Sequence, residues 1–235
     1  MVSIGLSRPA KGHGVKASAY LTAAKRSRKM PPHVVVTAGP TREHIDPVRF
    51  LSNPSTGKMG FAVARAAAER GYRVTLVAGP VALRTPRGVQ RVDVTSALEM
   101  EAAVALSDGD VLIATAAVAD WRPKICAKAK LKKSAMAGVL ELVRNPDILK
   151  ESNIPRKIGF AAETGDPVAE ALRKCREKGL EFCVANDVSE KGCGFGTAAN
   201  RVAIVRADGG VLRLPKMSKL AVARRIIGEL ERGAL

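Results

Sequence analysis

Two stretches of this chain share one pattern, in which a run of β-branched residues stops at a Gly-Pro pair. The runs are HVVVTA at residues 33–38 and YRVTLVA at residues 72–78. Short apolar runs that end at turn residues are typical of buried strands. Between them, residues 57–70 repeat alanine and valine at helical spacing and end at a glycine, which commonly follows a helix. The folded part of the chain is therefore predicted to begin as strand, helix, strand.

The same alternation runs through the rest of the chain. We expect strands at residues 90–94, 110–115, 157–162 and 181–185, helices at 96–106, 167–178 and 218–230, and a hairpin that pairs 201–206 with 211–214. Asn145 is expected to cap a further helix with Pro146 at its first position, and Ser218 to cap the last one. Strands that alternate with helices form parallel βαβ units. The sequence therefore predicts an α/β fold: a doubly wound, mainly parallel, Rossmann-like sheet with helices on both faces and a small β-hairpin or flap extension.

The domain is expected to begin at residue 33. Residues 1–32 are basic and have no continuous apolar core, so they do not form a secretory signal. We interpret them as a disordered tail, with a transit peptide or a wrongly chosen start codon as the alternatives. Residues 33–235 are long enough for one substantial core and are interpreted as a single domain.

The net charge of +17 raises nucleic acid as a partner. Seven of these charges lie in the first 30 residues, and the remainder is spread along the chain. With 3% aromatic residues there is little surface on which bases could stack. An anionic substrate explains the charge better, and we expect no nucleic-acid partner.

The remaining composition excludes several other classes of protein. The four cysteines lack C-x-x-C spacing, and the three histidines form no dyad or metal set. No apolar run reaches the roughly 18 residues that a membrane span needs. These features predict a soluble protein of the reducing cytoplasm with no membrane partner.

The tetrapeptide Gly57-Lys58-Met59-Gly60 resembles part of a nucleotide-binding P-loop, but the match fails. A P-loop needs a glycine where Ser52 stands and a hydroxyl residue where Met59 stands. The G-x-G-x-x-G spacing of a dinucleotide site is missing as well. What remains is a polar loop that leads into a helix N-terminus, where exposed N–H groups attract anions.

Two connections stand out, because ligands of doubly wound sheets bind beyond the carboxyl ends of the strands. The connection over residues 39–56 is much longer than the usual ~2–6 residues and carries arginines and hydroxyl groups suited to a phosphate. In the connection over residues 116–135, small residues let a flat ring approach the backbone, and Asp120 could bind a ribose or orient a metal. The alternative for the first connection is a solvated loop, and for Trp121 in the second it is simple packing.

A run of lysines between residues 124 and 133 is either a solvated face or a set of donors over a triphosphate. Lys174 and Lys178 lie four residues apart on one predicted helix. They could reach the same anion.

Taken together, these stretches resemble the bacterial phosphopantothenate–cysteine ligase family, the synthetase half of the bifunctional coenzyme A biosynthesis protein. The resemblance covers about residues 33–230 and rests on seven motifs in order. They are TAGPTREHIDPVRFLSNPSTGKMG, AAVADWRP, KLKK, LVRNPDIL, IGFAAET, VANDVS, and GFGTAANR followed by MSKLAVA.

The resemblance implies a ligase that joins 4′-phosphopantothenate to L-cysteine. CTP, with Mg²⁺, would activate the carboxylate as an acyl-cytidylate and release pyrophosphate, and the amine of cysteine would then displace CMP. The family is dimeric and builds its substrate site partly across the interface, so a homodimer with a shared active site is expected. Because only about 32 residues precede the first predicted strand, we expect the flavin-dependent decarboxylase that usually precedes this domain, and its FMN, to belong to a separate protein that would act next.

The resemblance also implies roles for individual residues. Asn53 and Lys130 are the expected catalytic residues, contacting the acyl intermediate and the CTP phosphates respectively. Lys130 opens the run KLKK, where related chains often have KIKK with an acid in place of Ala129. The expected nucleotide pocket consists of Ala114, Thr115, Ala116, Asp120, Lys130, Pro146, Asp147, Ile148, Leu149, Phe160, Lys174 and Lys178. The expected substrate-binding residues are Gly39, Thr41, Arg42, Asn53, Ser55, Thr56 and Gly57, and no metal ligands are assigned.

The residues alone leave two other functions open. The βαβ pattern also fits an NAD(P)-binding oxidoreductase of the Rossmann type, and the net charge fits a basic nucleic-acid-binding module, whose binding would depend steeply on salt. Neither function explains the loop over residues 39–58.

Overall fold

The computed structural model describes residues 30–132, 138–187, 189 and 196–233. Contacts separate Met1–Met30 from a compact unit that runs from Pro31 to Leu235. Residues 1–29 of the predicted tail lie outside the described residues. The compact unit begins two residues before the predicted domain boundary.

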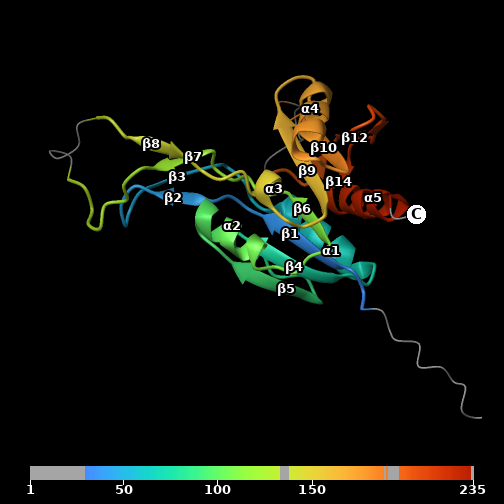
Figure 1. Ribbon diagram of the computed structural model, residues 1–235, viewed down its shortest axis with the longest axis horizontal. Helices are drawn as coiled ribbons and strands as arrows, with labels where there is room; N and C mark the ends of the chain where they lie inside the picture. The colour runs from blue at the N-terminus through green and yellow to red at the C-terminus, as the bar shows by residue number, and fades with distance from the viewer. Residues whose placement is uncertain (1–29, 133–137, 188, 190–195, 234–235) are drawn as a thin grey trace, which may run out of the picture. The chain divides into compact units, whose positions relative to one another are not determined.

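One large sheet organises the compact unit (Figure 1). In the described part of the chain it has eight strands in the order β13-β12-β10-β9-β6-β1-β4-β5. The strands are β1 (His33–Ala38), β4 (Arg73–Ala78), β5 (Val89–Asp93), β6 (Val111–Ala114), β9 (Arg156–Glu163), β10 (Phe182–Asp187), β12 (Val202–Arg206) and β13 (Val211–Arg213). The strands from β10 to β5 pair in parallel, whereas β12 and β13 form an antiparallel hairpin at one edge. The predicted doubly wound, mainly parallel sheet is confirmed.

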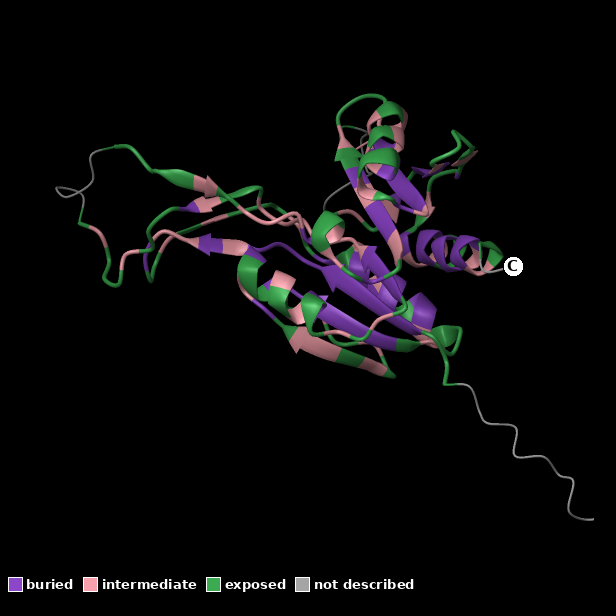
Figure 2. Cartoon of the chain, in the orientation of Figure 1, coloured by how far each residue is buried: buried purple, intermediate pink, exposed green. Residues whose placement is uncertain are grey.

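Helices cover both faces of the sheet. Helices α1 (Lys58–Glu69) and α5 (Lys219–Arg232) pack on one face, where Val34 and Val36 of β1 point. The alternate residue Val35 points to the opposite face and packs with α2 (Ala97–Ala105) and the short α3 (Ile148–Glu151). Helix α4 (Val168–Lys178) covers that face over β9 and β10. Figure 2 shows the resulting buried core along the central strands.

The strand order reverses beside β1, and the reversal brings two loops together at the carboxyl end of the sheet. The chain leaves β1 toward β4 and β5, then crosses back to form β6 on the other side of β1. The loops after β1 and β6 therefore run side by side, and Pro40 and Ala117 form a parallel bridge between them. Such a switch point is where ligands of open α/β sheets bind.

Two hairpins form an extension that we call the arm, comprising residues 42–52 and the described parts of residues 121–144. Strands β2 (Arg42–His44) and β3 (Phe50–Ser52) make one hairpin, and β7 (Trp121–Pro123) and β8 (Leu142–Arg144) make the other. Strands β2 and β7 contact each other, and Figure 1 shows both hairpins beyond the end of the main sheet. The predicted flap extension is therefore present. Residues 42–52 of the long connection after β1 form a hairpin, part of which is exposed to solvent.

Side chains cap three of the five helices in the described residues, whereas α1 and α4 have no side-chain cap. Ser96 and Ser218 cap α2 and α5 through their side chains, the second as predicted. The predicted cap at Asn145 is wrong, because Asp147 caps α3 by accepting the N–H of Lys150 at 3.1 Å. Asn145 instead donates its amide to the carbonyl of Ala119 at 2.8 Å, so a contact distant in sequence takes priority over the local one.

The glycines that suggested a P-loop have a packing role. Gly57 precedes α1 with φ of 73°, a left-handed conformation that side chains disfavour. A Cβ atom on Gly60 would lie 2.3 Å from Oγ1 of Thr115 and 2.4 Å from Cβ of Ala38. Glycine at these positions brings the N-terminus of α1 directly onto β1 and β6.

Among the described residues, no helix has both the length and the apolar character that crossing a lipid bilayer requires.

Candidate functional site

A large cavity of about 840 Å³ lies beyond the carboxyl ends of β1, β6 and β9. Its walls come from the loop after β6, the loop before α3, strand β9 and helix α4. Eleven of the predicted site residues line it: Asn53, Ala114, Ala116, Asp120, Pro146, Asp147, Ile148, Leu149, Phe160, Lys174 and Lys178. The predicted nucleotide pocket is therefore brought together by the fold, apart from Thr115 and Lys130.

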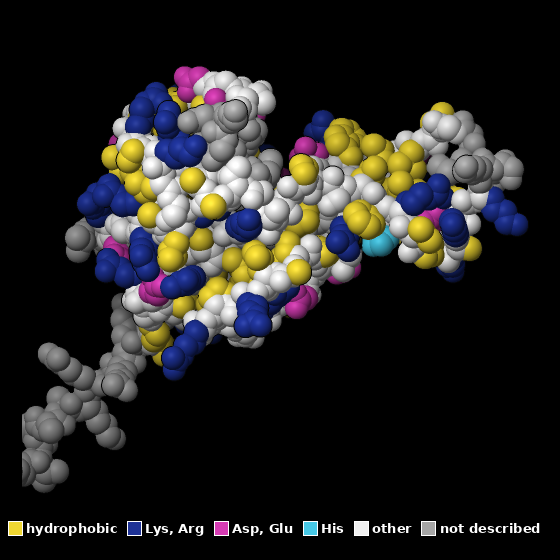
Figure 3. Space-filling view, turned by 180° about the vertical axis from the view of Figure 1, so that it is seen from behind, with side chains coloured by type: hydrophobic (Ala, Val, Ile, Leu, Met, Phe, Trp, Pro, Cys, Tyr) yellow, Lys and Arg dark blue, Asp and Glu magenta, His cyan; other side chains and the backbone are white. Residues whose placement is uncertain are grey.

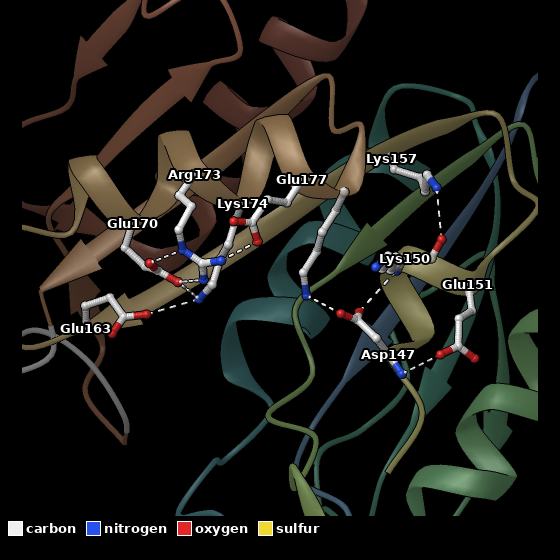
Figure 4. Close-up of polar contacts among 10 residues, drawn as sticks. Asp147, Lys150, Glu151, Lys157, Glu163, Glu170, Arg173, Lys174 and Glu177 are labelled. Carbon is white, nitrogen blue, oxygen red and sulfur yellow. Dashed lines mark hydrogen bonds and ion pairs between the residues drawn. The ribbon is translucent and has the colours of Figure 1, made fainter. Parts of the chain in front are cut away.

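Two lysines of α4 form the basic wall of the large cavity. Nζ of Lys174 lies 3.0 Å from Oε1 of Glu163, and Nζ of Lys178 lies 2.7 Å from Oδ2 of Asp147. Figure 4 shows Lys174 and Glu163 on one side of this region and Asp147 on the other. Both ammonium groups are fixed by carboxylates at the cavity wall, where an anionic ligand could compete for them.

The charge of Asp147 is stabilised by these contacts. Burial raises the pKa of its carboxyl group, but the ammonium of Lys178 and the N–H of Lys150 more than offset this, so that the pKa lies below its ordinary value. Asp147 is therefore a carboxylate that holds Lys178 against the N-terminus of α3.

Polar side chains fix the loop over residues 117–119, which forms one rim of the large cavity. Asn53 donates both hydrogens of its amide, to the carbonyls of Ala117 and Val118, each at 3.1 Å. Oγ1 of Thr41 accepts the N–H of Ala119 at 3.0 Å. Because its Nδ2 is committed to the loop, Asn53 presents its Oδ1 as the atom available to a ligand.

A small cavity of about 120 Å³ adjoins the large one at the N-terminus of α1. Its lining includes Ser55, Thr56, Gly57 and Thr115, and it shares a wall with the large cavity. The shared residues are Ala116, Ala117, Phe160 and Ala162. The loop over residues 53–57 thus runs from one cavity to the other.

The small cavity also contains three buried polar residues that the sequence analysis did not select. Nζ of Lys219 lies 3.3 Å from Oδ1 of Asn200, and the two residues are 8% and 4% exposed. Asn186 is 8% exposed, and its Oδ1 has no hydrogen-bond partner among the described residues. All three lie in motifs quoted above, and membership of those motifs is the signal that could have selected them.

Four predicted residues line neither cavity. Gly39 packs under Gly57, and Thr41 supports the loop as described above. The guanidinium of Arg42 lies 4.7 Å from the ring centre of Phe50 on the arm. Lys130 is exposed in the arm, so the fold of one chain does not bring it to the nucleotide pocket, and its role stays a prediction.

The mouth of the large cavity combines an aromatic ring with a carboxylate. Trp121 is 45% exposed, and the guanidinium of Arg144 lies 5.3 Å from the centre of its ring. The neighbouring Asp120 lines the cavity, and its carboxylate makes no ion pair within the described residues. The described part of the chain holds no cluster of three or more metal-ligating side chains.

Comparisons with known proteins agree with this architecture. Residues 31–233 match the DNA/pantothenate metabolism flavoprotein C-terminal domain. The chain is 49% identical over 205 residues to the coenzyme A biosynthesis bifunctional protein CoaBC of Bacillus subtilis (strain 168), which covers 84% of this chain and 50% of that protein. It is 44% identical over 208 residues to the protein of the same name from Escherichia coli (strain K12), covering 84% of this chain and 51% of that protein.

A solved structure points to the same half of these proteins. The crystal structure of the C-terminal domain of a coenzyme A biosynthesis bifunctional protein CoaBC superposes with a TM-score of 0.73 at 42% identity. It covers 86% of this chain and 95% of that domain, whereas the chain spans about half the length of the curated relatives. The chain belongs to the family of DNA/pantothenate metabolism flavoprotein C-terminal domains.

Proposed function

We propose that this protein is a CTP-dependent phosphopantothenate–cysteine ligase that acts in coenzyme A biosynthesis. The observation that carries the proposal is the pair of adjoining cavities, with Asn53 at the rim of the large one and the N-terminus of α1 at the small one. A reaction that joins an activated nucleotide to a phosphorylated acid needs two anion sites that share one wall. The 42–49% identity to CoaBC sequences and to the CoaBC C-terminal domain supports this assignment.

The nucleotide is proposed to occupy the large cavity. Its size suits a nucleotide-sized ligand, and Lys174 and Lys178 supply cationic donors to phosphate oxygens. Mg²⁺ keeps several waters and needs only one or two carboxylates in addition to substrate phosphates. Asp120 fits that requirement, because its carboxylate lines the cavity and is not neutralised by an ion pair in the described residues. The ion would neutralise the phosphate charge of CTP.

The phosphate of 4′-phosphopantothenate is proposed to bind in the small cavity. Helix N-termini attract anions through their free N–H groups, and α1 has no side-chain cap that would occupy them. The hydroxyl groups of Ser55 and Thr56 and the ammonium of Lys219 line the same space. These groups would hold the phosphate while the carboxyl end of the acid extends past Ala116 and Ala117 toward the nucleotide.

The chemistry then proceeds in two displacements. The substrate carboxylate attacks the α-phosphorus of CTP, forming the acyl-cytidylate and releasing pyrophosphate. The amine of cysteine attacks the acyl carbon, the amide bond forms, a proton is lost from nitrogen, and CMP leaves. Asn53 would contact the acyl intermediate through Oδ1, since its Nδ2 already binds Ala117 and Val118. Lys130 would stabilise the charge on the CTP phosphates.

The active protein is proposed to be a homodimer with a shared active site. The arm exposes Val48, Phe50, Trp121, Ile125 and Leu142, each at least 40% accessible, and Figure 3 shows hydrophobic side chains gathered on that part of the surface. Exposed apolar surface of this kind favours association. Lys130 lies in the arm and lines neither cavity of its own chain. We therefore propose that it reaches the nucleotide pocket of a second copy of the chain.

The activity can be tested directly with purified protein. Incubation with CTP, Mg²⁺, 4′-phosphopantothenate and cysteine should release pyrophosphate and form 4′-phosphopantothenoyl-cysteine, and omission of cysteine should leave the acyl-cytidylate. ATP tested in parallel gives the nucleotide preference. No pyrophosphate with either nucleotide at saturation would refute the ligase assignment. NAD(P) binding in the absence of nucleotide triphosphate binding would instead favour an oxidoreductase.

The proposed cellular setting follows from the reaction. We place the protein in the cytoplasm with small-molecule substrates, and expect neither membrane nor nucleic acid as a partner. A flavin-dependent decarboxylase would consume the product.

A further inference from the structure

A buried aspartate connects the two hairpins of the arm. Asp46 lies between β2 and β3 and is fully buried. Its Oδ1 accepts the N–H groups of Val48 and Arg49, each at 2.8 Å. Its Oδ2 accepts Nε of Arg49 and the N–H of Leu131, each at 3.1 Å. The first pair of bonds closes a local turn, whereas the bond to Leu131 reaches the other hairpin.

Two further bonds fasten the same segment. Nη2 of Arg49 donates to the carbonyl of Leu131 at 3.0 Å, so that both backbone groups of Leu131 are held by the Asp46–Arg49 pair. The N–H of Ala127 donates to the carbonyl of Ile45 at 2.9 Å. The segment is therefore attached to the β2–β3 loop on both sides of Lys130.

The aspartate is surrounded by donors. The guanidinium of Arg49 and the N–H groups of Val48, Arg49 and Leu131 hold the pKa of Asp46 far below its ordinary value, against the opposing effect of burial. With these donors the carboxylate of Asp46 is ionised near neutral pH, and an ionised carboxylate can accept the N–H of Leu131.

We propose that Asp46 is a positioning residue that fixes the backbone beside Lys130, so that the lysine is presented from a defined point of the arm. The inference rests on the proposed function, since Lys130 needs a fixed position only if it acts on the CTP phosphates. A lysine side chain has a long flexible stem, and anchoring its backbone reduces the conformational freedom that must be lost when it engages an anion. The turn between β2 and β3 needs only Oδ1, so the bond from Oδ2 to Leu131 serves the lysine segment.

Asp46→Asn separates these two tasks. The amide oxygen of asparagine can still accept the N–H groups of Val48 and Arg49. Its NH₂ group faces the N–H of Leu131 and the guanidinium of Arg49 and can accept from neither, so both bonds to Leu131 lose their support. The turn should remain while the tether to the lysine segment is lost. Glu43→Gln is the matched control, because Glu43 is also buried on this hairpin and accepts only the N–H of Ala97, at 3.0 Å, among the bonds described.

The first readout is independent of activity. The full-length native protein is treated briefly with trypsin, and cleavage after Lys128 and Lys130 is followed by mass spectrometry. We expect Asp46→Asn to be cut there about tenfold faster than the wild type, as the loss of a charge-assisted hydrogen bond implies, and Glu43→Gln to be cut at the wild-type rate. Equal rates for Asp46→Asn and wild type would overturn the proposal.

The second readout is a double-mutant cycle on pyrophosphate release. Asp46→Asn should lower kcat about tenfold with little change in the KM for 4′-phosphopantothenate, and should cost nothing further in a Lys130→Ala background, because coupled residues are not additive. A full additional loss in that background would show that Asp46 acts independently of Lys130, as a general effect on folding would, and would overturn the proposal. If Lys130→Ala leaves no measurable rate, the trypsin comparison decides alone. If the wild type itself releases no pyrophosphate, the ligase assignment is wrong. This result differs from failure of the Asp46 proposal, in which the wild type is active.

Discussion

Nζ of Lys178 lies 2.7 Å from Oδ2 of Asp147, and this ion pair joins α4 to the N-terminus of α3 at the wall of the large cavity. Lys178 is thus held in place before any ligand arrives. A bound polyphosphate would bring further negative charge close to the Lys178 ammonium. Because Lys178 is already in position, it can stabilise the charge of the phosphate without a costly rearrangement of the protein.

Removal of this cation should weaken nucleotide binding. Lys178→Met leaves an aliphatic stem of similar length and should raise the Kd for CTP about tenfold, because hydrogen bonds to charged groups contribute more than neutral ones. Isothermal titration calorimetry measures the change. Arg176→Met is the control, since it removes a positive charge from the same helix at an exposed position that lines neither cavity. Equal losses for the two variants would mean that only the net charge of α4 matters.

The Asp147 carboxylate also predicts a pH dependence of stability. Its pKa lies below the ordinary value in the folded protein, so it contributes stability that is present above the unfolded pKa of about 4 and is lost as the pH falls through the folded pKa. Asp147→Asn keeps a helix cap but removes the charge, so its unfolding free energy should fall less steeply than that of the wild type below pH 4. Urea unfolding between pH 6 and acid, with Asp208→Asn in an exposed turn as the control, measures the difference.

The close approach of α1 to the sheet predicts a steric effect. Gly60→Ala would place Cβ against Thr115 and Ala38, and overpacking of this kind costs about 1–3 kcal/mol. Gly228→Ala in α5 meets no atom within 4 Å and should instead stabilise the protein by about 0.4–1 kcal/mol. Chemical denaturation of both variants gives the comparison. A Gly60→Ala variant as stable as Gly228→Ala would contradict the packing role assigned to Gly60.

A strand or helix could be predicted from the sequence where its own residues are enough to determine its conformation. The β1 strand was predicted with its observed bounds, because a β-branched run buried on both faces has little alternative. Strands β2, β3, β7 and β8 could not be predicted, because each is three residues long and is defined by its partner rather than by an internal period. The cap at Asn145 was mispredicted for the same reason, because its amide donates to the carbonyl of Ala119, 26 residues away, instead of capping the nearest helix.

The site was predicted unevenly for a related reason. Asn53, Lys174 and Lys178 were found because loop length, helix spacing or motif marks them, and they do line the large cavity. Asn186, Asn200 and Lys219 come from three separate segments and meet because β10 ends, and α5 begins, beside the small cavity. No local pattern distinguishes a buried lysine of this kind from a solvated one.

Lys219 should contribute to both binding and stability. Lys219→Met removes the ammonium that lies 3.3 Å from Oδ1 of Asn200, and the loss of this donor to a buried oxygen should lower the free energy of unfolding by about 1–3 kcal/mol. We also expect the Kd for 4′-phosphopantothenate to rise at least about tenfold. Lys216→Met, at an exposed position just before α5, is the control for both measurements. Unaltered substrate affinity in Lys219→Met would remove the ammonium from the proposed phosphate site.

Asn53 allows the two chemical steps to be separated. In Asn53→Asp the NH₂ group that donates to Ala117 and Val118 is replaced by a carboxylate oxygen that cannot donate, and a negative charge stands beside the acyl intermediate. We expect pyrophosphate release to persist and the acyl-cytidylate to accumulate. Amide formation should fall about hundredfold, the scale of losses seen when a preorganised polar group at the reacting centre is replaced.

Thr41→Val distinguishes direct contact from support of the loop. This variant loses only the bond from the N–H of Ala119, so it should disturb the loop over residues 117–119 without touching the intermediate. If Asn53 acts only by holding that loop, Thr41→Val should also accumulate the acyl-cytidylate. If Asn53 contacts the intermediate, Thr41→Val should slow both steps in similar proportion, because the loop forms the wall that both substrates share. Rapid-quench analysis of pyrophosphate, acyl-cytidylate and amide in both variants decides between these results, and normal amide formation in Asn53→Asp would remove Asn53 from the second step.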